Sequence, residues 1–168
     1  NTFEEIRLAK RSLPFTLAID GEGKIWFTET GTGTIGFINP QNNEITKFSD
    51  ENPLQGPEAL IFDKDGNLWI AEHTGTGIAK FNPILETFER FPVPDLEALP
   101  FGMAFDRYDN IWFAQHTVDN IAAYDPHNNK LIEVPVPTQA IFEPWVAVPP
   151  STVVTVTISV LILYGNDI

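Results

Sequence analysis

Apolar and polar residues alternate along this chain in short runs that are separated by turn-forming residues. The first unit extends from Leu13 to Phe48 and contains four such runs: TLAI, KIWFTE, TIGFIN and EITKF. Short runs of this kind predict β-strands, and the Asp-Gly-Glu-Gly sequence between the first two supplies the residues that a tight hairpin needs. The pattern therefore predicts an all-β fold built from four-stranded units.

The unit recurs every 43 residues without a gap. The positions that are identical in all three copies are Pro14, Pro57 and Pro100; Asp20, Asp63 and Asp106; Trp26, Trp69 and Trp112; Ile35, Ile78 and Ile121; and Pro40, Pro83 and Pro126. Four strands in about 40 to 45 residues is the size of one β-propeller blade. A β-sandwich, the competing all-β architecture, does not predict a fixed period with one Trp per unit. We therefore predict a β-propeller with four-stranded antiparallel blades.

The repeat divides the chain into five parts. We expect blades at residues 13–55, 56–98 and 99–140, and the outer strand of a preceding blade at residues 1–12, where TFEEIRL is similar to the later segment TFERFPV. For residues 141–168 we predict a divergent partial blade or a hydrophobic tail. Propellers close with about 4 to 8 blades, and this chain holds about 3.5 to 4. We favour an incomplete ring, a fragment of a larger propeller, over a four-bladed ring or a half ring completed by a second chain.

The segment STVVTVTISVLILY at residues 151–164 departs from the repeat. Its Val, Thr and Ile residues favour two strands that complete a last blade. A membrane anchor is a second interpretation, although Pro149 and Pro150 interrupt the apolar stretch and anchors need about 20 residues. An aberrant end of the chain is the third.

Charge and composition narrow the classes of partner. The chain has 10 basic and 23 acidic residues, a net charge of −13, which repels the phosphate backbone of nucleic acids and anionic membranes. It has no cysteine, which excludes disulfides and thiol nucleophiles. We expect no nucleic-acid partner and no membrane contact except through a C-terminal anchor. The compartment is not determined by sequence, with an extracytoplasmic one slightly favoured.

The segments WFTE, WIAE and WFAQ end the second strand of each unit, and an Asn-Pro or Asp-Pro turn follows the third strand. Over residues 13 to about 137 this pattern resembles the repeat of the virginiamycin B lyase, or streptogramin lyase, family. The resemblance implies a seven-bladed propeller that opens a cyclic depsipeptide ester by elimination, using Mg²⁺ with Glu and His near the central axis. The family has a catalytic histidine in Pro-His-Gly at the start of the first strand. Here Phe15, Glu58, Phe101 and Trp145 occupy that position.

Strand order alone predicts where chemistry can take place. In an up-and-down blade, the start of the first strand and the end of the second lie at one mouth of the channel. We therefore expect His73 and His116 to be the catalytic bases there, and Glu29, Glu58 and Glu72 to hold a metal ion, Mg²⁺ in particular. An alternative for the strand-end acids is that they hold the following turn. An alternative for the two histidines is a solvated turn position.

Two functions follow from these expectations. The first is a metal-assisted enzyme, a carbon–oxygen lyase or lactonase, that opens a small cyclic ester. The second is a non-catalytic scaffold that binds an unknown protein or glycan, since propellers support both roles. We also expect self-association if the ring is incomplete.

Overall fold

The computed structural model describes residues 5–75 and 77–136, and these form three four-stranded antiparallel sheets. Each sheet keeps the order of its strands along the chain, so that every strand pairs with its sequence neighbour. The strands are β1 (Pro14–Ile19), β2 (Ile25–Glu29), β3 (Thr34–Asn39), β4 (Glu44–Phe48), β5 (Pro57–Phe62), β6 (Leu68–Glu72), β7 (Gly77–Asn82), β8 (Thr87–Pro92), β9 (Pro100–Phe105), β10 (Ile111–Gln115), β11 (Asn120–Asp125) and β12 (Lys130–Pro135).

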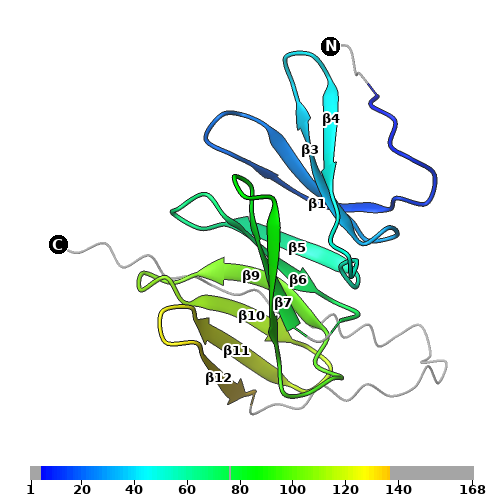
Figure 1. Cartoon of the computed structure of the whole chain (residues 1–168). Coiled ribbons are helices and arrows are strands. Elements are labelled where there is room, and N and C mark those ends of the chain that lie inside the picture. Colours follow the sequence, from blue (N-terminus) through cyan, green and yellow to red (C-terminus); the bar gives the residue numbers. More distant parts are fainter. Residues whose placement is uncertain (1–4, 76, 137–168) are drawn as a thin grey trace, which may run out of the picture.

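The three sheets are the first, second and third blades of a β-propeller, as the repeat predicts. Figure 1 shows them following one another in chain order, from the first blade in blue and cyan to the third in yellow-green and brown. The first strands of the blades lie next to one another, with β5 in contact with both β1 and β9. Within the described residues the blades form an arc, and the ring is not closed.

Each of the three sheets lies within its own predicted blade range. The exact boundaries of these ranges, residues 13–55, 56–98 and 99–140, stay a prediction. Residues 5–13 carry no strand, and the outer strand expected at residues 1–12 lies partly outside the described residues. The partial blade or tail expected at residues 141–168 lies wholly outside them. The described part of the chain contains no helix long and apolar enough to cross a membrane.

An aspartate organises the hairpin between the first two strands of every blade. Asp63 accepts hydrogen bonds from the backbone N–H groups of Asp65 and Asn67 and from the indole N–H of Trp69. Asp20 and Asp106 do the same for Trp26 and Trp112. Each turn also needs one residue in the left-handed region, which is Gly23, Gly66 or Asp109, with φ of 85°, 82° and 66°. Glycine and aspartate are among the residues that tolerate this conformation best.

The core lies between the blades, where Trp26 and Trp69, two of the three repeated tryptophans, are buried. The indole of Trp26 in the first blade contacts Phe62 and Phe81 of the second, with ring centroids 6.0 and 6.1 Å apart. Trp69 of the second blade contacts Tyr124 of the third in the same way, at 5.9 Å. The first and second blades therefore each present a Trp to the next blade, and the second blade also receives the Trp of the first on its other face.

Candidate functional site at the channel mouth

The pairing of the first strand with the second is irregular just after the first proline of each blade, at the mouth of the channel. In the second blade Pro57 pairs with Glu72, and the register then shifts before Ala59 pairs with Ala71. Glu58 lies in this bulge. In the third blade the irregularity lies one position later in the repeat, at Gly102, whose φ of 53° suits glycine. Bulges are common beside active sites because they redirect a side chain.

Three of the five predicted site residues meet here. The imidazole rings of His73 and His116 are stacked, with centroids 5.1 Å apart and planes at 19°. Nε2 of His73 is 3.8 Å from Oε2 of Glu58. All three side chains are half-buried, so they are shielded from bulk water while they remain accessible from the channel.

Two phenylalanines complete this surface. The ring of Phe101 meets His73 edge to face, at 5.7 Å between centroids, and Phe15 meets Phe101 in the same manner at 6.2 Å. Both phenylalanines are exposed. We call Phe15, Glu58, His73, Phe101 and His116 the mouth cluster. It brings together residues of all three described blades, and the exposed phenyl rings offer an apolar surface beside the titratable groups.

The protonation of His116 depends on this arrangement. Burial lowers the pKa of its imidazole below the ordinary value, the positive charge of His73 lowers the pKa further, and the carboxylate of Glu58 opposes both effects. His116 is therefore predominantly neutral near pH 7. A neutral imidazole can accept a proton.

The backbone fixes the tautomer of His73. Its Nδ1 lies 3.4 Å from the carbonyl oxygen of Pro100, and because a carbonyl can only accept, Nδ1 carries the proton. In the first blade the hydroxyl of Thr30 donates to the carbonyl of Pro57 at 3.1 Å. The contact thus recurs between blades, which shows that His73 also links the second blade to the third. Its Nε2 is left to face Glu58.

The other two predicted metal ligands, Glu29 and Glu72, are buried inside their own blades. Glu29 accepts hydrogen bonds from the hydroxyls of Thr32 and Thr34 and from Nζ of Lys47, which is 2.7 Å away. Burial by itself raises the pKa of this carboxyl, but the hydrogen bonds and charge of its partners outweigh that effect, and the pKa lies below its usual range. Glu29 is therefore an anion whose charge is already compensated.

Glu72 has the equivalent pair in the second blade. Its Oε1 accepts from Nη1 of Arg90 at 2.6 Å and from the backbone N–H of Gln55 at 2.9 Å. Arg90 also donates to Asp50 and to the carbonyl of Asn52. Both acids therefore connect the second strand of a blade to its fourth strand, across the third, in addition to any role in the following turn.

In the third blade the donor is on the second strand and the acceptor is on the fourth, the reverse of the other two blades. Gln115 stands at the position of Glu29 and Glu72, and its amide nitrogen donates to Glu133 at 2.8 Å. These partners were not predicted, although the sequence contains the signal. Lys47, Arg90 and Glu133 lie 18 positions after Glu29, Glu72 and Gln115, and the basic residue disappears only where the acid does.

The residues described here do not suit the Mg²⁺ ion that the family resemblance implies. Mg²⁺ requires several oxygen ligands, but the carboxylates of Glu29 and Glu72 are engaged by Lys47 and Arg90. Glu58 is left with two imidazoles. Among residues 5–75 and 77–136, no group of three or more His, Asp or Glu side chains is placed to hold a metal ion.

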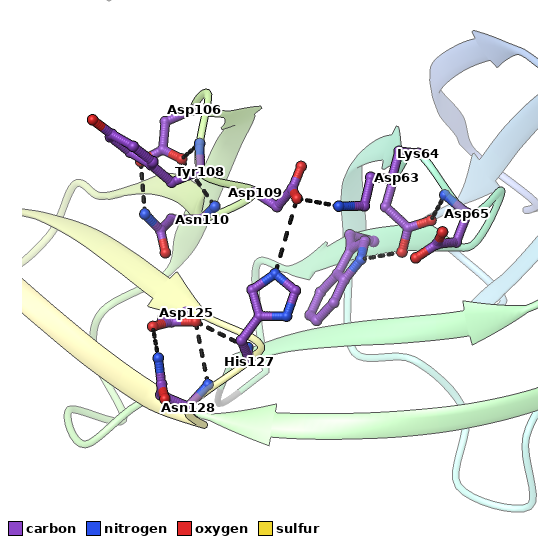
Figure 2. A network of polar contacts seen from close by, with 11 residues as sticks. Asp63, Lys64, Asp65, Asp106, Tyr108, Asp109, Asn110, Asp125, His127 and Asn128 are labelled. Carbon is purple, nitrogen blue, oxygen red and sulfur yellow. Dashed lines mark hydrogen bonds and ion pairs between the residues drawn. The ribbon is translucent and has the colours of Figure 1, made fainter.

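His127 lies at the opposite mouth and takes no part in the cluster. Figure 2 shows it beside Asp109, with Nε2 of His127 3.9 Å from Oδ2 of Asp109. The same oxygen of Asp109 pairs with Nζ of Lys64, which joins the hairpins of the second and third blades. Lys64 and His127 are exposed, and Asp63, Asp106 and Asp125 accept hydrogen bonds from backbone N–H groups of their own turns.

Two hollows of about 480 and 580 Å³ lie between neighbouring blades and include no residue of the mouth cluster.

Comparison with known families agrees with this architecture. The profile of the Virginiamycin B lyase family matches residues 1–160. The chain belongs to the virginiamycin B lyase family. This confirms the resemblance inferred from the repeated strand ends. A search of curated protein sequences gave no match.

Solved structures of this family share the fold. A streptogramin B lyase is 25% identical over 81% of this chain and 45% of its own length, with a TM-score of 0.74. A catalytically inactive His-to-Ala variant of the Staphylococcus aureus virginiamycin B lyase, with quinupristin, is 23% identical over 77% of this chain and 43% of its own, with a TM-score of 0.71. The chain thus spans less than half the length of these relatives.

Similarity extends beyond the family at the level of the fold. The extracellular domain of a one-component system from B. thetaiotaomicron is 20% identical over 72% of this chain and 18% of its own, with a TM-score of 0.58.

Proposed function

We propose that the mouth cluster binds a cyclic ester of the streptogramin type and opens it by elimination, with His116 as the base. The observation that carries this proposal is the stack of His116 on His73 beside Glu58, because it keeps one half-buried imidazole neutral next to a second that faces a carboxylate. Pairs of titratable groups whose environments differ in this way are typical of acid–base sites. Family membership supports the substrate class.

The proposed reaction needs no water. His116 accepts the proton from the carbon next to the carbonyl group of the ester-bearing residue. The electrons of that C–H bond form a C=C bond, and the bond between the β-carbon and the ester oxygen breaks. The ester oxygen leaves as part of a carboxylate, and His116 later returns its proton to solvent.

The other residues of the cluster bind and orient. His73, held by the Pro100 carbonyl, presents Nε2 beside Glu58, where it can contact polar groups of the bound ester. The exposed rings of Phe15 and Phe101 can pack against aromatic or aliphatic groups of the substrate. The same proposal includes an extracytoplasmic location and assistance by Mg²⁺, for which groups other than the described residues would be needed as ligands. Neither is used in these steps.

Mass spectrometry of the chain incubated with quinupristin tests the reaction. Elimination gives a linear product with the mass of the substrate, whereas hydrolysis adds the mass of one water. We expect His116→Asn to abolish opening and His127→Asn, at the far mouth, to leave it unchanged. Assays with Mg²⁺ and with a chelator measure any dependence on the metal. Binding without opening by the wild-type chain would contradict the proposed reaction.

A binding scaffold is the second candidate. It is favoured by the side chains Phe15, Glu58 and Phe101, which stand where the family motif has histidine. Saturable binding of quinupristin that is lost in Phe101→Ala, without any product, would support this alternative. A protein or glycan partner would be supported if the wild-type chain binds that partner and Phe101→Ala binds it equally well.

A further inference from the structure

Two threonines of the first blade hold the backbone on either side of Glu58. The hydroxyl of Thr30 donates to the carbonyl oxygen of Pro57 at 3.1 Å, and the hydroxyl of Thr16 donates to the carbonyl oxygen of Glu58 itself. Both threonines are half-buried, and Pro57 is fully buried. The two carbonyl groups that flank the Cα atom of Glu58 are therefore fixed by the neighbouring blade. We call Thr16 and Thr30 the threonine clamp.

The strand pairing of the second blade does not hold Glu58. Pro57 pairs with Glu72 and Ala59 pairs with Ala71, so Glu58 is left without a partner on β6. The ladder of hydrogen bonds is disrupted at such a residue. The threonine clamp supplies the attachment that the ladder lacks at this position.

Thr16 is itself held inside the first blade. Its backbone N–H donates to the hydroxyl of Thr28 at 3.2 Å, and Thr28 is fully buried. The equivalent positions in the other two blades carry no hydroxyl group: they are Ala59, Ala71, Gly102 and Ala114. Among the three described blades, only the first can therefore place a hydroxyl at this point.

The junction of the second and third blades has only half of this arrangement. Nδ1 of His73 contacts the carbonyl of Pro100 there, in the way that Thr30 contacts the blade after it. Ala59, however, stands at the position of Thr16 and has no hydroxyl to donate. Packing between blades therefore does not require both contacts. The complete clamp occurs at the junction that carries the one carboxylate of the mouth cluster.

We infer that Thr16 and Thr30 are positioning residues, which hold the carboxylate of Glu58 beside His73 and His116. Oε2 of Glu58 lies 3.8 Å from Nε2 of His73, so a change in the unpaired backbone would separate the two groups. Where the inference concerns catalysis, it rests on the proposed function. The position of Glu58 can also be followed without turnover, because its carboxylate opposes the lowering of the pKa of His116.

An NMR titration of His116 tests the clamp directly. Thr16→Val keeps the shape of the side chain and removes the hydroxyl, so the Glu58 carboxylate should move away and the pKa of His116 should fall below its wild-type value. Thr16→Ser keeps the hydroxyl and should leave this pKa unchanged. The matched control is Thr46→Val, at an exposed position on β4, which should also leave it unchanged.

A double-variant cycle shows whether the effect passes through Glu58. In the Glu58→Gln background, Thr16→Val should no longer change the pKa of His116, since no carboxylate remains to be displaced. Thr30→Val removes the other contact and should behave as Thr16→Val does. An unchanged pKa of His116 in both Val variants, or an equal change in the Glu58→Gln background, would overturn the inference. So would loss of the fold in both, by circular dichroism, because the hydroxyls would then be needed to join the blades.

Opening of quinupristin separates this inference from the proposed function. We expect Thr16→Val to lower kcat by up to about 10-fold, because His116 becomes a weaker base, and to leave KM nearly unchanged. A rise in KM with kcat unchanged would place Thr16 in substrate binding and overturn its positioning role. If the wild-type chain opens no ester, the proposed function fails and the titration alone decides whether the clamp positions Glu58.

Discussion

His73 and His116 stack with their ring centroids 5.1 Å apart, so a proton on either ring disfavours a proton on the other. The first prediction concerns this coupling. The pKa of His116 should lie below 6.5 in an NMR titration. His73→Asn should raise it, because the neighbouring positive charge is lost, and Glu58→Gln should lower it further, because the compensating carboxylate is lost.

His127→Asn is the control for that titration, and it should leave the pKa of His116 unchanged. The lowered pKa also makes folding depend on pH. The unfolded chain holds a proton on His116 that the folded chain releases, so stability should fall as pH drops below about 6.5. A pKa of His116 that does not move in either variant would contradict the coupling.

The second prediction concerns the buried pair of Glu29 and Lys47. Lys47→Glu places two carboxylates together and should cost about 2 to 4 kcal/mol, toward the low end for a buried pair because Lys47 is about a third exposed. Adding Glu29→Gln should recover most of this loss, because the double variant reproduces the Gln115–Glu133 pair of the third blade. Urea denaturation of the single and double variants measures the cycle. Additive losses would show that the two side chains are not coupled.

A third prediction follows from the lowered pKa of Glu29. A carboxyl with a folded pKa below its unfolded value contributes stability above the unfolded value, near 4.5, and that contribution is lost as pH falls through the folded value. The wild-type chain should therefore lose more stability between pH 5 and acid than Glu29→Gln does. Thermal unfolding at a series of pH values measures the difference, and parallel curves would contradict it.

The fourth prediction compares two equivalent hairpin aspartates. Asp63→Ala leaves the buried indole N–H of Trp69 and two backbone N–H groups without their acceptor, and should cost about 1 to 3 kcal/mol. Asp106→Ala should cost less, because Trp112 is 36% exposed and water can replace the carboxylate. Chemical denaturation of both variants gives the comparison. Equal losses in the two variants would contradict this dependence on the exposure of the indole.

The repeat was sufficient to predict the fold because the recurring apolar positions are those that pack between blades. Trp26, Trp69 and Trp112 share one register, and the structure places the first two between blades as expected. The strand order also predicted which strand ends share a mouth, and Glu58, His73 and His116 do meet there.

The roles of Glu29 and Glu72 could not be predicted in the same way. Their partners Lys47 and Arg90 are not on an adjacent strand but two strands away, and the contact crosses the blade face. Alternation of side chains gives the face of a strand, not the reach of a lysine or arginine across it. The contact of Phe101 with His73 was missed for a similar reason, since it joins neighbouring blades, next to a register shift that strand alternation does not predict.

The reversed pair of the third blade also limits how blades can be exchanged during evolution. A crossover between repeats that joined β6 to the fourth strand of the third blade would set the buried carboxylate of Glu72 against the exposed carboxylate of Glu133, with no cation between them. The opposite crossover would set Gln115 beside Arg90 and remove the buried carboxylate that Glu72 gives this guanidinium. An exchange that transfers the second to fourth strands of a blade together keeps both members of the pair.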